Sequence, residues 1–352
     1  MKITAIQAAV EHLKPARSAD AYAGQESLTF VRCTVSTDEE LTGYGLTGRF
    51  LAAEVAHLLN QGFASAANGL DPMDIEAITA TLSARFNPRQ STGVFMSALS
   101  AFDQALWDLK GQSLGLPVAR LIGNARPAVA AYATVGLPAF AEDQLIAACA
   151  KALQDGYQGV KILVGSRSIA EDAQRVRAVR GAIGSAALML DANCSYTVAE
   201  ARRLADAVAD CDIAFFEEPV RGNDIRSLAA LRRATRIPLA SGQMIQSITW
   251  FRDVLLAEGL DVLQPNAAFC GGISAMLRIL ALAEAHQLPV TGAGGYEAAN
   301  LPVMAGHRHG GMLEVHGAHA AIRDRFASHP DFQAGQLTVP TTAGIGFTLK
   351  TL

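Results

Sequence analysis

From about residue 127 onward, short apolar runs alternate with helix-like stretches, and this alternation constrains the fold more than any other feature. Helical periodicity fills residues 170–183, 197–209 and 273–286. The repeat is about 22 to 30 residues, close to the strand–helix unit of an eight-stranded barrel. Strands that alternate with helices indicate a parallel sheet, and eight of them favour closure. The apolar runs end near Tyr132, Lys161, Asp191, Glu217, Gln243, Asn266, Gly292 and Glu314.

The first part of the chain mixes strand and helix patterns. Residues 27–36 alternate as a strand does, residues 37–40 are polar, and a second turn is predicted at Gly43-Tyr44-Gly45. Helical periodicity is clearest over residues 96–111. Residues 43–48 match the dinucleotide-binding pattern GxGxxG, which also needs a following strand. Residues 60–71 do not predict such a strand, so we interpret residues 43–48 as a hairpin turn. We predict an α+β domain over residues 1–124, a barrel over 125–316, and a segment over 317–352 that returns to the first domain.

Composition and charge exclude several classes of protein. The hydrophobic fraction of 50% is too high for a disordered chain, and 29 basic against 33 acidic residues give no electropositive footprint for nucleic acid. The sequence contains no run of about 18 uncharged apolar residues, so it predicts no membrane span, and the first residues do not resemble a signal peptide. The five cysteines form no CxxC pair. We therefore expect a cytoplasmic protein with reduced thiols.

Acidic side chains follow two consecutive predicted strands of the barrel. Asp191 and Glu217 each end a hydrophobic run. In a barrel of this type, functional side chains gather at the carboxyl ends of the strands. A single acid there is more often a helix cap or a surface ion-pair partner. Two acids at the same end of a barrel, shielded from water, must share a proton or bind a cation, and hard oxygen ligands suit Mg²⁺.

Five segments, in order and spacing, span nearly the whole chain and resemble the enolase superfamily, in its mandelate racemase and muconate lactonizing branch. The resemblance implies an α/β fold: a modified (β/α)7β barrel of the TIM type under an N-terminal α+β capping domain. It also implies magnesium-assisted removal of the proton beside a substrate carboxylate. The segments are AFDQALWDLKG (101–111) with LGLP (114–117), GVKILVG (159–165), LDAN (190–193), FEEP (216–219), and Gln264-Pro265 through Gly271-Gly272.

The resemblance carries over unevenly to the residues of the site. Asp191 and Glu217 match the first two metal ligands, but the third position, where an acid is expected, is Gln243. A glutamine carbonyl can still coordinate Mg²⁺, with one negative charge less, so the affinity should fall. Lys161 matches the lysine that assists the substrate carboxylate. The second lysine of the pair, usually the proton-abstracting base, is Leu163 here.

Other losses narrow the chemistry that the resemblance implies. Asn266 replaces the aspartate of the Asp–His dyad found in some members, and residues 292–295 cover the histidine position. Two-base racemisation is therefore disfavoured. If Lys161 takes over proton abstraction, dehydration of a hydroxy acid or acid sugar is the leading prediction, and burial would have to lower its pKa. A cycloisomerase or epimerase, and a binding protein that has lost catalysis, are the alternatives. Glu314 matches an acid that hydrogen-bonds the enediolate.

Six further residues are candidates for the site. Tyr296 is a candidate acid in place of the missing histidine, and His316 is a second residue that could face the mouth. Arg49 and Arg89 lie in capping-domain loops and are candidates for a second carboxylate or a hydroxylated tail. Asn193 and Asn266 are taken as substrate-binding residues. The expected partner is a small carboxylate, with no nucleic acid or membrane, and the family's habit predicts a homo-oligomer.

Overall fold

A computed structural model describes residues 1–14, 28–86, 92–136, 140–328 and 331–349. The N-terminal part is a three-stranded antiparallel sheet in the order β1-β2-β3, packed against helices. The strands are β1 (Ile3–Leu13), β2 (Leu28–Thr37) and β3 (Thr42–Thr47). The helical elements are α1 (Ala52–His57), a π-helical segment (Leu58–Phe63), α2 (Ala64–Ala67), α3 (Ile75–Phe86), α4 (Val94–Leu114) and α5 (Val118–Ile122).

Eight parallel strands form the second part, in the order β10-β11-β4-β5-β6-β7-β8-β9. A bridge between Leu263 and Val290 brings the two ends together, so the barrel is nearly closed, as predicted. The strands are β4 (Ala128–Val135), β5 (Gly159–Leu163), β6 (Ala187–Asp191), β7 (Ile213–Glu217), β8 (Leu239–Ser241), β9 (Val262–Leu263), β10 (Thr291–Gly292) and β11 (Met312–His316).

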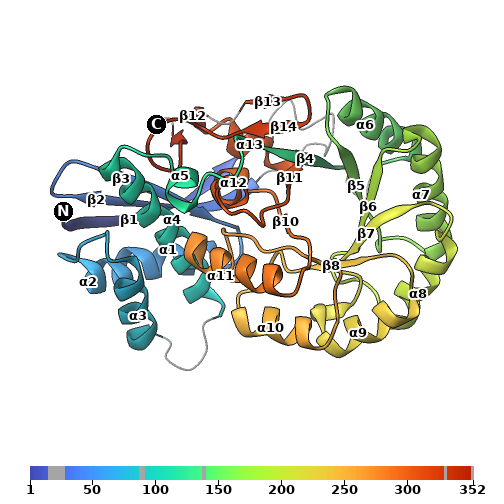
Figure 1. Cartoon of the computed structure of the whole chain (residues 1–352), viewed down its shortest axis with the longest axis horizontal. Helices are drawn as coiled ribbons and strands as arrows, with labels where there is room; N and C mark the ends of the chain where they lie inside the picture. Colours follow the sequence, from blue (N-terminus) through green and yellow to red (C-terminus); the bar gives the residue numbers. More distant parts are fainter. Residues whose placement is uncertain (15–27, 87–91, 137–139, 329–330, 350–352) are drawn as a thin grey trace.

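Helices cover the outside of the barrel, and Figure 1 shows α6 to α9 as a layer around β5, β6 and β7. The outward residues of each strand join the core under these helices, as Val160 and Ile162 of β5 do. The helices are α6 (Glu142–Gln154), α7 (Ile169–Ile183), α8 (Val198–Ala207), α9 (Ile225–Ala234), α10 (Ile248–Leu256), α11 (Gly272–Ala285) and α12 (Glu297–Gly306). A short 3₁₀ turn (Arg221–Asn223) precedes α9.

The C-terminal segment lies against both parts of the molecule (Figure 1). Its β14 pairs with β4 of the barrel, while the backbone N–H of Ile345 donates to Asp108 of α4. The segment therefore contacts the N-terminal part, and the division of the chain at residues 124 and 316 stays a prediction. The elements are a 3₁₀ turn (Gly317–His319), α13 (Ala320–Arg323), β12 (Phe326–Ser328), β13 (Phe332–Gln333), β14 (Gln336–Thr338) and β15 (Thr348–Leu349).

The predicted turn at Gly43-Tyr44-Gly45 is wrong, because these residues lie inside strand β3. The two glycines are there for a close approach of backbones. A Cβ on Gly45 would lie 1.9 Å from the carbonyl oxygen of Ala101, and one on Gly43 would lie 2.2 Å from that of Ala105. Only glycine lets β3 lie this close to α4. A Cβ on Gly48 would lie 2.4 Å from the ring of Phe269, so close packing accounts for all three glycines of the GxGxxG pattern without a nucleotide.

Among the described residues, no helix combines the length and apolar character needed to cross a bilayer.

Candidate active site

A buried lysine surrounded by carboxylates lies at the carboxyl end of the barrel strands. The Nζ atom of Lys161 on β5 lies 2.5 Å from Oε2 of Glu217, 3.1 Å from Oε1 of Glu314 and 3.2 Å from Oδ2 of Asp191. The lysine and Glu217 side chains are fully buried, and the other two are at most 4% exposed. Inward-facing positions on β5, β6, β7 and β11 therefore bring four of the predicted residues together.

One ammonium faces three carboxylates in this cluster. Burial lowers the pKa of Lys161, but attraction to Glu217, Glu314 and Asp191 outweighs it and raises the pKa well above its ordinary value. The condition set for Lys161 as the base, that burial lower its pKa, is not met in this arrangement. Lys161 is an ammonium that donates hydrogen bonds to its neighbours.

Glu314 is held as a carboxylate by donors on three sides. Burial alone would raise its pKa, but Lys161 and His316, together with the Thr134 hydroxyl, lower the pKa to about 2. Thr134 donates to Oε1, and the backbone N–H of Gly294 donates to Oε2. The side chain is therefore an ionised acceptor fixed at the end of β11.

Three oxygen donors beside the lysine fit a divalent cation. Glu217 accepts hydrogen bonds at Oε2 from Lys161 and Gln264, but its other oxygen, Oε1, is buried without a hydrogen-bond partner. An unpartnered buried carboxylate oxygen is costly, and a cation would satisfy it. Gln243 donates its amide N–H to Oε2 of Glu218 at 3.0 Å, which leaves its carbonyl oxygen free to coordinate. Asp191 contributes the third donor.

The third donor is an amide in place of an acid, and this changes the charge of the site. Within the described ranges, no cluster of three or more His, Cys, Asp or Glu side chains is arranged to hold a metal ion. The available set is two carboxylates and one amide carbonyl. Such a set is hard and oxygen-based, as Mg²⁺ prefers, although it carries one negative charge less than three acids.

A cavity of about 190 Å³ lies above this cluster and is built from both parts of the chain. Leu28 of β2 and the two residues Arg49 and Phe50 after β3 come from the N-terminal part. The remaining lining residues come from the barrel and from the turn after β11. The cavity is large enough for a small acid and has polar groups on several sides. Predicted site residues that line it are Arg49, Asp191, Asn193, Gln243, Tyr296 and Glu314.

Two predicted residues have clear local roles at the rim. Asn193 has a positive φ of 44°, and its backbone N–H donates to Oδ1 of Asp191 at 2.8 Å. Tyr296 begins α12 with a φ of 56°, and its ring packs edge-on against Phe269 and His319. Burial raises the pKa of Tyr296, so its phenol stays protonated.

Asn266, a predicted substrate-binding residue, does not line the cavity. Asn266 is fully buried, and its Oδ1 accepts from the backbone N–H of Ala268 and from the amide of Asn300. This is a loop-holding role, so the structure gives no direct support for substrate binding by Asn266. Arg89 lies outside the described residues.

The sequence analysis did not single out His319, which the structure places on the cavity wall beside His316. The two imidazole rings stack with centroids 5.0 Å apart at 26°. His316, which follows Glu314 by two residues, was predicted as a residue that could face the mouth, and it lines the cavity. His319 lies in the turn after the strand, where no periodic pattern predicts a direction.

Comparisons with known proteins agree with this geometry. The mandelate racemase/muconate lactonizing enzyme N-terminal domain model matches residues 2–123, and the enolase C-terminal domain-like model of the same family matches residues 144–351. The chain belongs to this branch of the enolase superfamily. The family predicted from sequence segments is therefore confirmed, and the barrel with its N-terminal α+β domain is the fold of this family.

Two curated relatives of this family member are a dehydratase and a cycloisomerase. L-talarate/galactarate dehydratase of Salmonella typhimurium is 35% identical over 222 residues, which cover 62% of this chain and 55% of that enzyme. D-galactarolactone cycloisomerase of Agrobacterium fabrum is 32% identical over 300 residues, covering 80% of this chain and 79% of that one. The predicted enzyme classes, lyase or isomerase, are confirmed at the level of the family.

Solved structures of the family contain magnesium. A racemase from Streptomyces coelicolor with bound magnesium superposes with a TM-score of 0.91 at 26% identity, covering 99% of this chain and 97% of that one. L-talarate dehydratase from Polaromonas, in complex with Mg and L-glucarate, superposes with a TM-score of 0.87 at 27% identity, covering 99% and 95%. The predicted metal is thus the one held by relatives of the same fold.

Proposed function

We propose that this chain dehydrates a hydroxylated carboxylic acid, in particular an acid sugar, by removing the proton beside the carboxylate. The electron pair of the C–H bond forms an enediolate, the neighbouring C–O bond breaks, and the hydroxide leaves as water after taking up a proton. The enol that remains becomes a 2-keto acid. The observation that carries the proposal is the buried Lys161 cluster, with its unpartnered Glu217 oxygen, beneath a cavity that fits a small acid.

We include Mg²⁺ in this proposal, held by Asp191, Glu217 and the carbonyl oxygen of Gln243. When bound, the ion supplies positive charge to the carboxylate oxygens of the substrate and so stabilises the enediolate. The unpartnered oxygen of Glu217 and the oxygen-only donor set support this assignment.

Lys161 and Glu314 are the proposed catalytic groups: Glu314 lines the cavity, and the buried Lys161 contacts Glu314 and Asp191, which both line it. Neutral Lys161 is the proposed base for the proton beside the substrate carboxylate, and the ammonium that it becomes then donates a hydrogen bond to an oxygen of the enediolate. Because three carboxylates raise its pKa, it can accept that proton only after their negative charge has been compensated. Glu314, ionised, accepts a hydrogen bond from the enediolate once one of its oxygens is protonated. Tyr296 is a proposed neutral donor at the rim.

Arg49 is the proposed group for the far end of the substrate. It comes from the N-terminal part and lines the same cavity as Asn193 and the barrel acids Asp191 and Glu314. A guanidinium binds a second carboxylate or a run of hydroxyls in a fixed geometry. Arg89 remains a prediction for the same role. The proposed partner is therefore a small-molecule carboxylate.

A cycloisomerase is the second candidate. It is favoured by the relatives of that activity, which match about as much of the chain as the dehydratases do, including a 3,6-anhydro-alpha-L-galactonate cycloisomerase at 31% identity over 82% of the chain. One base suffices for this chemistry too. If the protein binds an acid without converting it, both the dehydratase and the cycloisomerase assignments are wrong.

The deciding experiment incubates the protein with Mg²⁺ and galactarate, galactonate, arabinonate or L-glucarate in deuterated water. We expect a 2-keto acid in the NMR spectrum, and Lys161→Ala should abolish it. Deuterium incorporation without a keto product would indicate epimerisation, and a rearranged product with no loss of water would indicate cycloisomerisation. Unchanged acids, with bound Mg²⁺, would identify a binding protein.

We further propose a cytoplasmic, homo-oligomeric protein. All five cysteines are free thiols, and Cys33, Cys149, Cys211 and Cys270 are buried, which supports a reducing compartment. The oligomer is proposed from the habit of the family and is tested by light scattering.

A further inference from the structure

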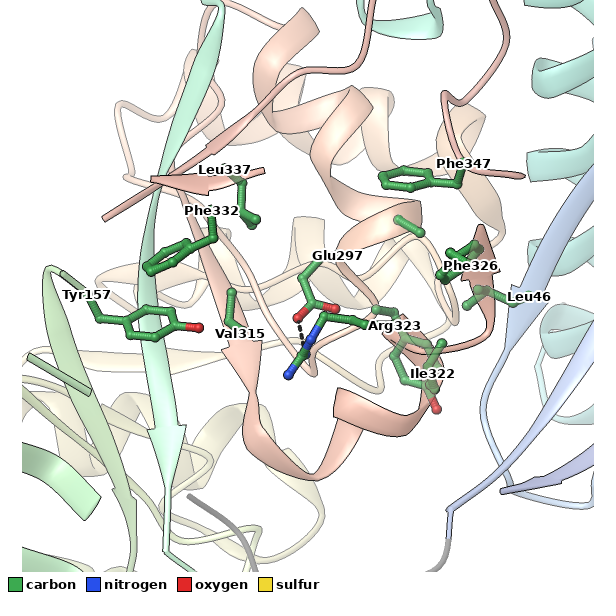
Figure 2. Close-up of a pocket in the computed structure, with 12 residues that line it drawn as sticks. Leu46, Tyr157, Glu297, Val315, Ile322, Arg323, Phe326, Phe332, Leu337 and Phe347 are labelled. Atoms are coloured by element: carbon green, nitrogen blue, oxygen red, sulfur yellow. Dashed lines mark hydrogen bonds and ion pairs between the residues drawn. The ribbon is translucent and has the colours of Figure 1, made fainter. Parts of the chain in front are cut away.

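Two imidazoles at the end of β11 face the cavity and have no role in the mechanism above. Successive strand residues point to opposite faces. Figure 2 shows Val315 on the outer face, in a separate apolar cavity of about 100 Å³ with Phe332 and Leu337. Glu314 and His316 consequently point to the inner face, where both line the cavity of the candidate site.

A backbone contact fixes which nitrogen of His316 carries the proton. The backbone N–H of Ala318 donates to Nδ1 of His316 at 3.1 Å. A backbone amide can only donate, so Nδ1 must offer its lone pair, and the proton of the neutral ring is on Nε2. Burial lowers the pKa of His316 and outweighs the attraction of Glu314. The ring is thus a neutral N–H donor.

The neighbours of His316 hold its ring in place before any substrate arrives. The ring of His319 stacks on it at 5.0 Å and is itself packed edge-on against Tyr296 at 4.6 Å. Arg323 donates to the carbonyl oxygen of His316 at 3.3 Å and to Glu297 at 2.8 Å, the ion pair drawn in Figure 2. Donors that are fixed in advance lose little entropy on binding.

The glycine-rich loop after β10 makes room for this pair. A Cβ on Gly295 would lie 2.2 Å from Nδ1 of His319 and 3.2 Å from Cβ of His316. Residues 292–295 are Gly-Ala-Gly-Gly and bring no polar side chain of their own. The space beside the loop is filled by imidazoles from the next strand and its turn.

We infer that His316 is a hydrogen-bond donor to the hydroxyl oxygen on the carbon next to the reacting one, and that His319 is its positioning residue. This rests on the proposed function. His316 keeps its proton throughout, and its hydrogen bond strengthens as negative charge develops on the departing oxygen. The charged groups that act on His316 are Glu314, Lys161, Asp191 and Arg323. On the far side of the stacked His319 ring lie Tyr296 and Arg49.

Two substitutions separate a donor from an acid–base group. His316→Gln can place an amide N–H near the position of Nε2 but cannot titrate, whereas His316→Phe keeps the ring shape without a donor. We expect kcat/KM to fall by about 100-fold in His316→Phe and by about tenfold or less in His316→Gln, within the range for loss of one donor. The shape of the pH profile should be the same in His316→Gln and the wild type. Equal losses in both variants would overturn the inference.

Two further readouts do not depend on turnover. In ¹⁵N-labelled protein near neutral pH, His316 should show an imidazole protonated on Nε2 only, and a ring that is charged or protonated on Nδ1 would overturn the inference. With Mg²⁺ present, His316→Phe should weaken binding of galactonate about tenfold while binding of 3-deoxygalactonate stays unchanged, as measured by calorimetry. His319→Ala removes the stacked ring and should weaken binding of galactonate while binding of 3-deoxygalactonate stays unchanged. His319→Phe restores a ring at this position and should recover most of the lost affinity, and an unchanged affinity in His319→Ala would overturn the positioning role.

These outcomes separate failure of the inference from failure of the proposed function. If the wild type binds galactonate and 3-deoxygalactonate with different affinities but turns over neither, the dehydratase assignment fails and the contact stands. If it dehydrates galactonate and His316→Phe loses no selectivity for the hydroxyl, the contact fails and the assignment stands. A wild type that binds neither acid overturns the contact as well.

Discussion

Lys161 shows how a single buried charge can hold a catalytic site together. Its ammonium is the cation shared by Asp191, Glu217 and Glu314. Lys161→Met should leave three buried carboxylates without it, and removing one partner of a buried ion pair costs about 3–5 kcal/mol. In the presence of a chelator we therefore expect Lys161→Met to have a lower Tm than the wild type.

Added Mg²⁺ should reduce this difference in Tm, because in Lys161→Met the ion no longer meets the repulsion of an ammonium beside the same carboxylates. The increase in Tm with Mg²⁺ should be larger in Lys161→Met than in the wild type, although turnover is lost. Lys151→Met is the matched control, since Lys151 is half exposed and pairs with Asp155 across one helical turn. That variant should change stability by less than about 1 kcal/mol. A Lys161→Met protein with unchanged Tm and unchanged Mg²⁺ response would contradict the charge argument.

Gln243 gives a second prediction for a single residue. Gln243→Glu supplies a carboxylate where the amide now offers a neutral oxygen, so Mg²⁺ affinity should rise about tenfold or more at neutral pH. Titration calorimetry with Mg²⁺ alone measures this directly. Gln246→Glu adds the same charge three residues away, where Gln246 bonds Gly93 and Ser97, and should leave the affinity nearly unchanged. Equal effects of both variants would mean that Gln243 is not a ligand.

Among the elements, α4 connects the N-terminal sheet, the barrel and the C-terminal segment through buried polar side chains. Gln104 bonds both backbone groups of Leu46 in β3 and the carbonyl of Ala267 after β9. Asp108 accepts from the backbone N–H groups of Tyr44 and Ile345. These bonds hold the loop that carries Arg49 over the barrel.

The titration of Asp108 should be visible in the stability of the fold. Burial raises its pKa to about 6, and an unfolded aspartate titrates near about 3.9. Between these values the folded state binds more protons than the unfolded one, so this contribution to stability falls as the pH rises from about 4 to about 6. Asp108→Asn cannot titrate and keeps one acceptor oxygen.

Urea unfolding at about pH 4.5 and about pH 7 measures the effect. The stability of the wild type relative to Asp108→Asn should be greater at the lower pH. The exposed Asp206 of α8 provides the control variant Asp206→Asn, for which this difference should not depend on pH in the same way. A wild-type advantage that grows as the pH rises would contradict the prediction.

The elements that were predictable are those whose periodicity is set by one buried face. The barrel strands and helices such as α7 and α11 follow the predicted ranges within a few residues because apolar spacing alone defines them. Gly43 and Gly45 were misread, since a glycine needed for close packing looks the same as a glycine needed for a turn. The raised pKa of Lys161 was not predictable from the sequence either, because it depends on three residues from distant strands.

At the scale of the whole molecule, the cavity exists only where the two parts of the chain meet. Arg49 and Phe50 come from one part, and Asp191, Gln243 and Glu314 come from the other. A metal ion bound to Asp191 and Glu217 touches the barrel alone, whereas an acid that reaches Arg49 touches both. The two ligands should therefore stabilise the chain in different ways.

Mg²⁺ and galactarate together should raise the Tm by more than the sum of their separate effects, because the ion creates the site for one carboxylate and Arg49 binds the other. Stabilisation by a ligand grows with its concentration relative to Kd, so an excess of about 100-fold contributes about 2.7 kcal/mol. Arg49→Ala should keep the Mg²⁺ increment and lose most of the galactarate increment, while Asp191→Asn should lose both. Arg85→Ala is the matched control, since Arg85 lies on α3, does not line this cavity and stacks on Phe86. If Arg49→Ala keeps the full galactarate increment, the far end of the substrate binds within the barrel, and the N-terminal part encloses the cavity without binding the acid.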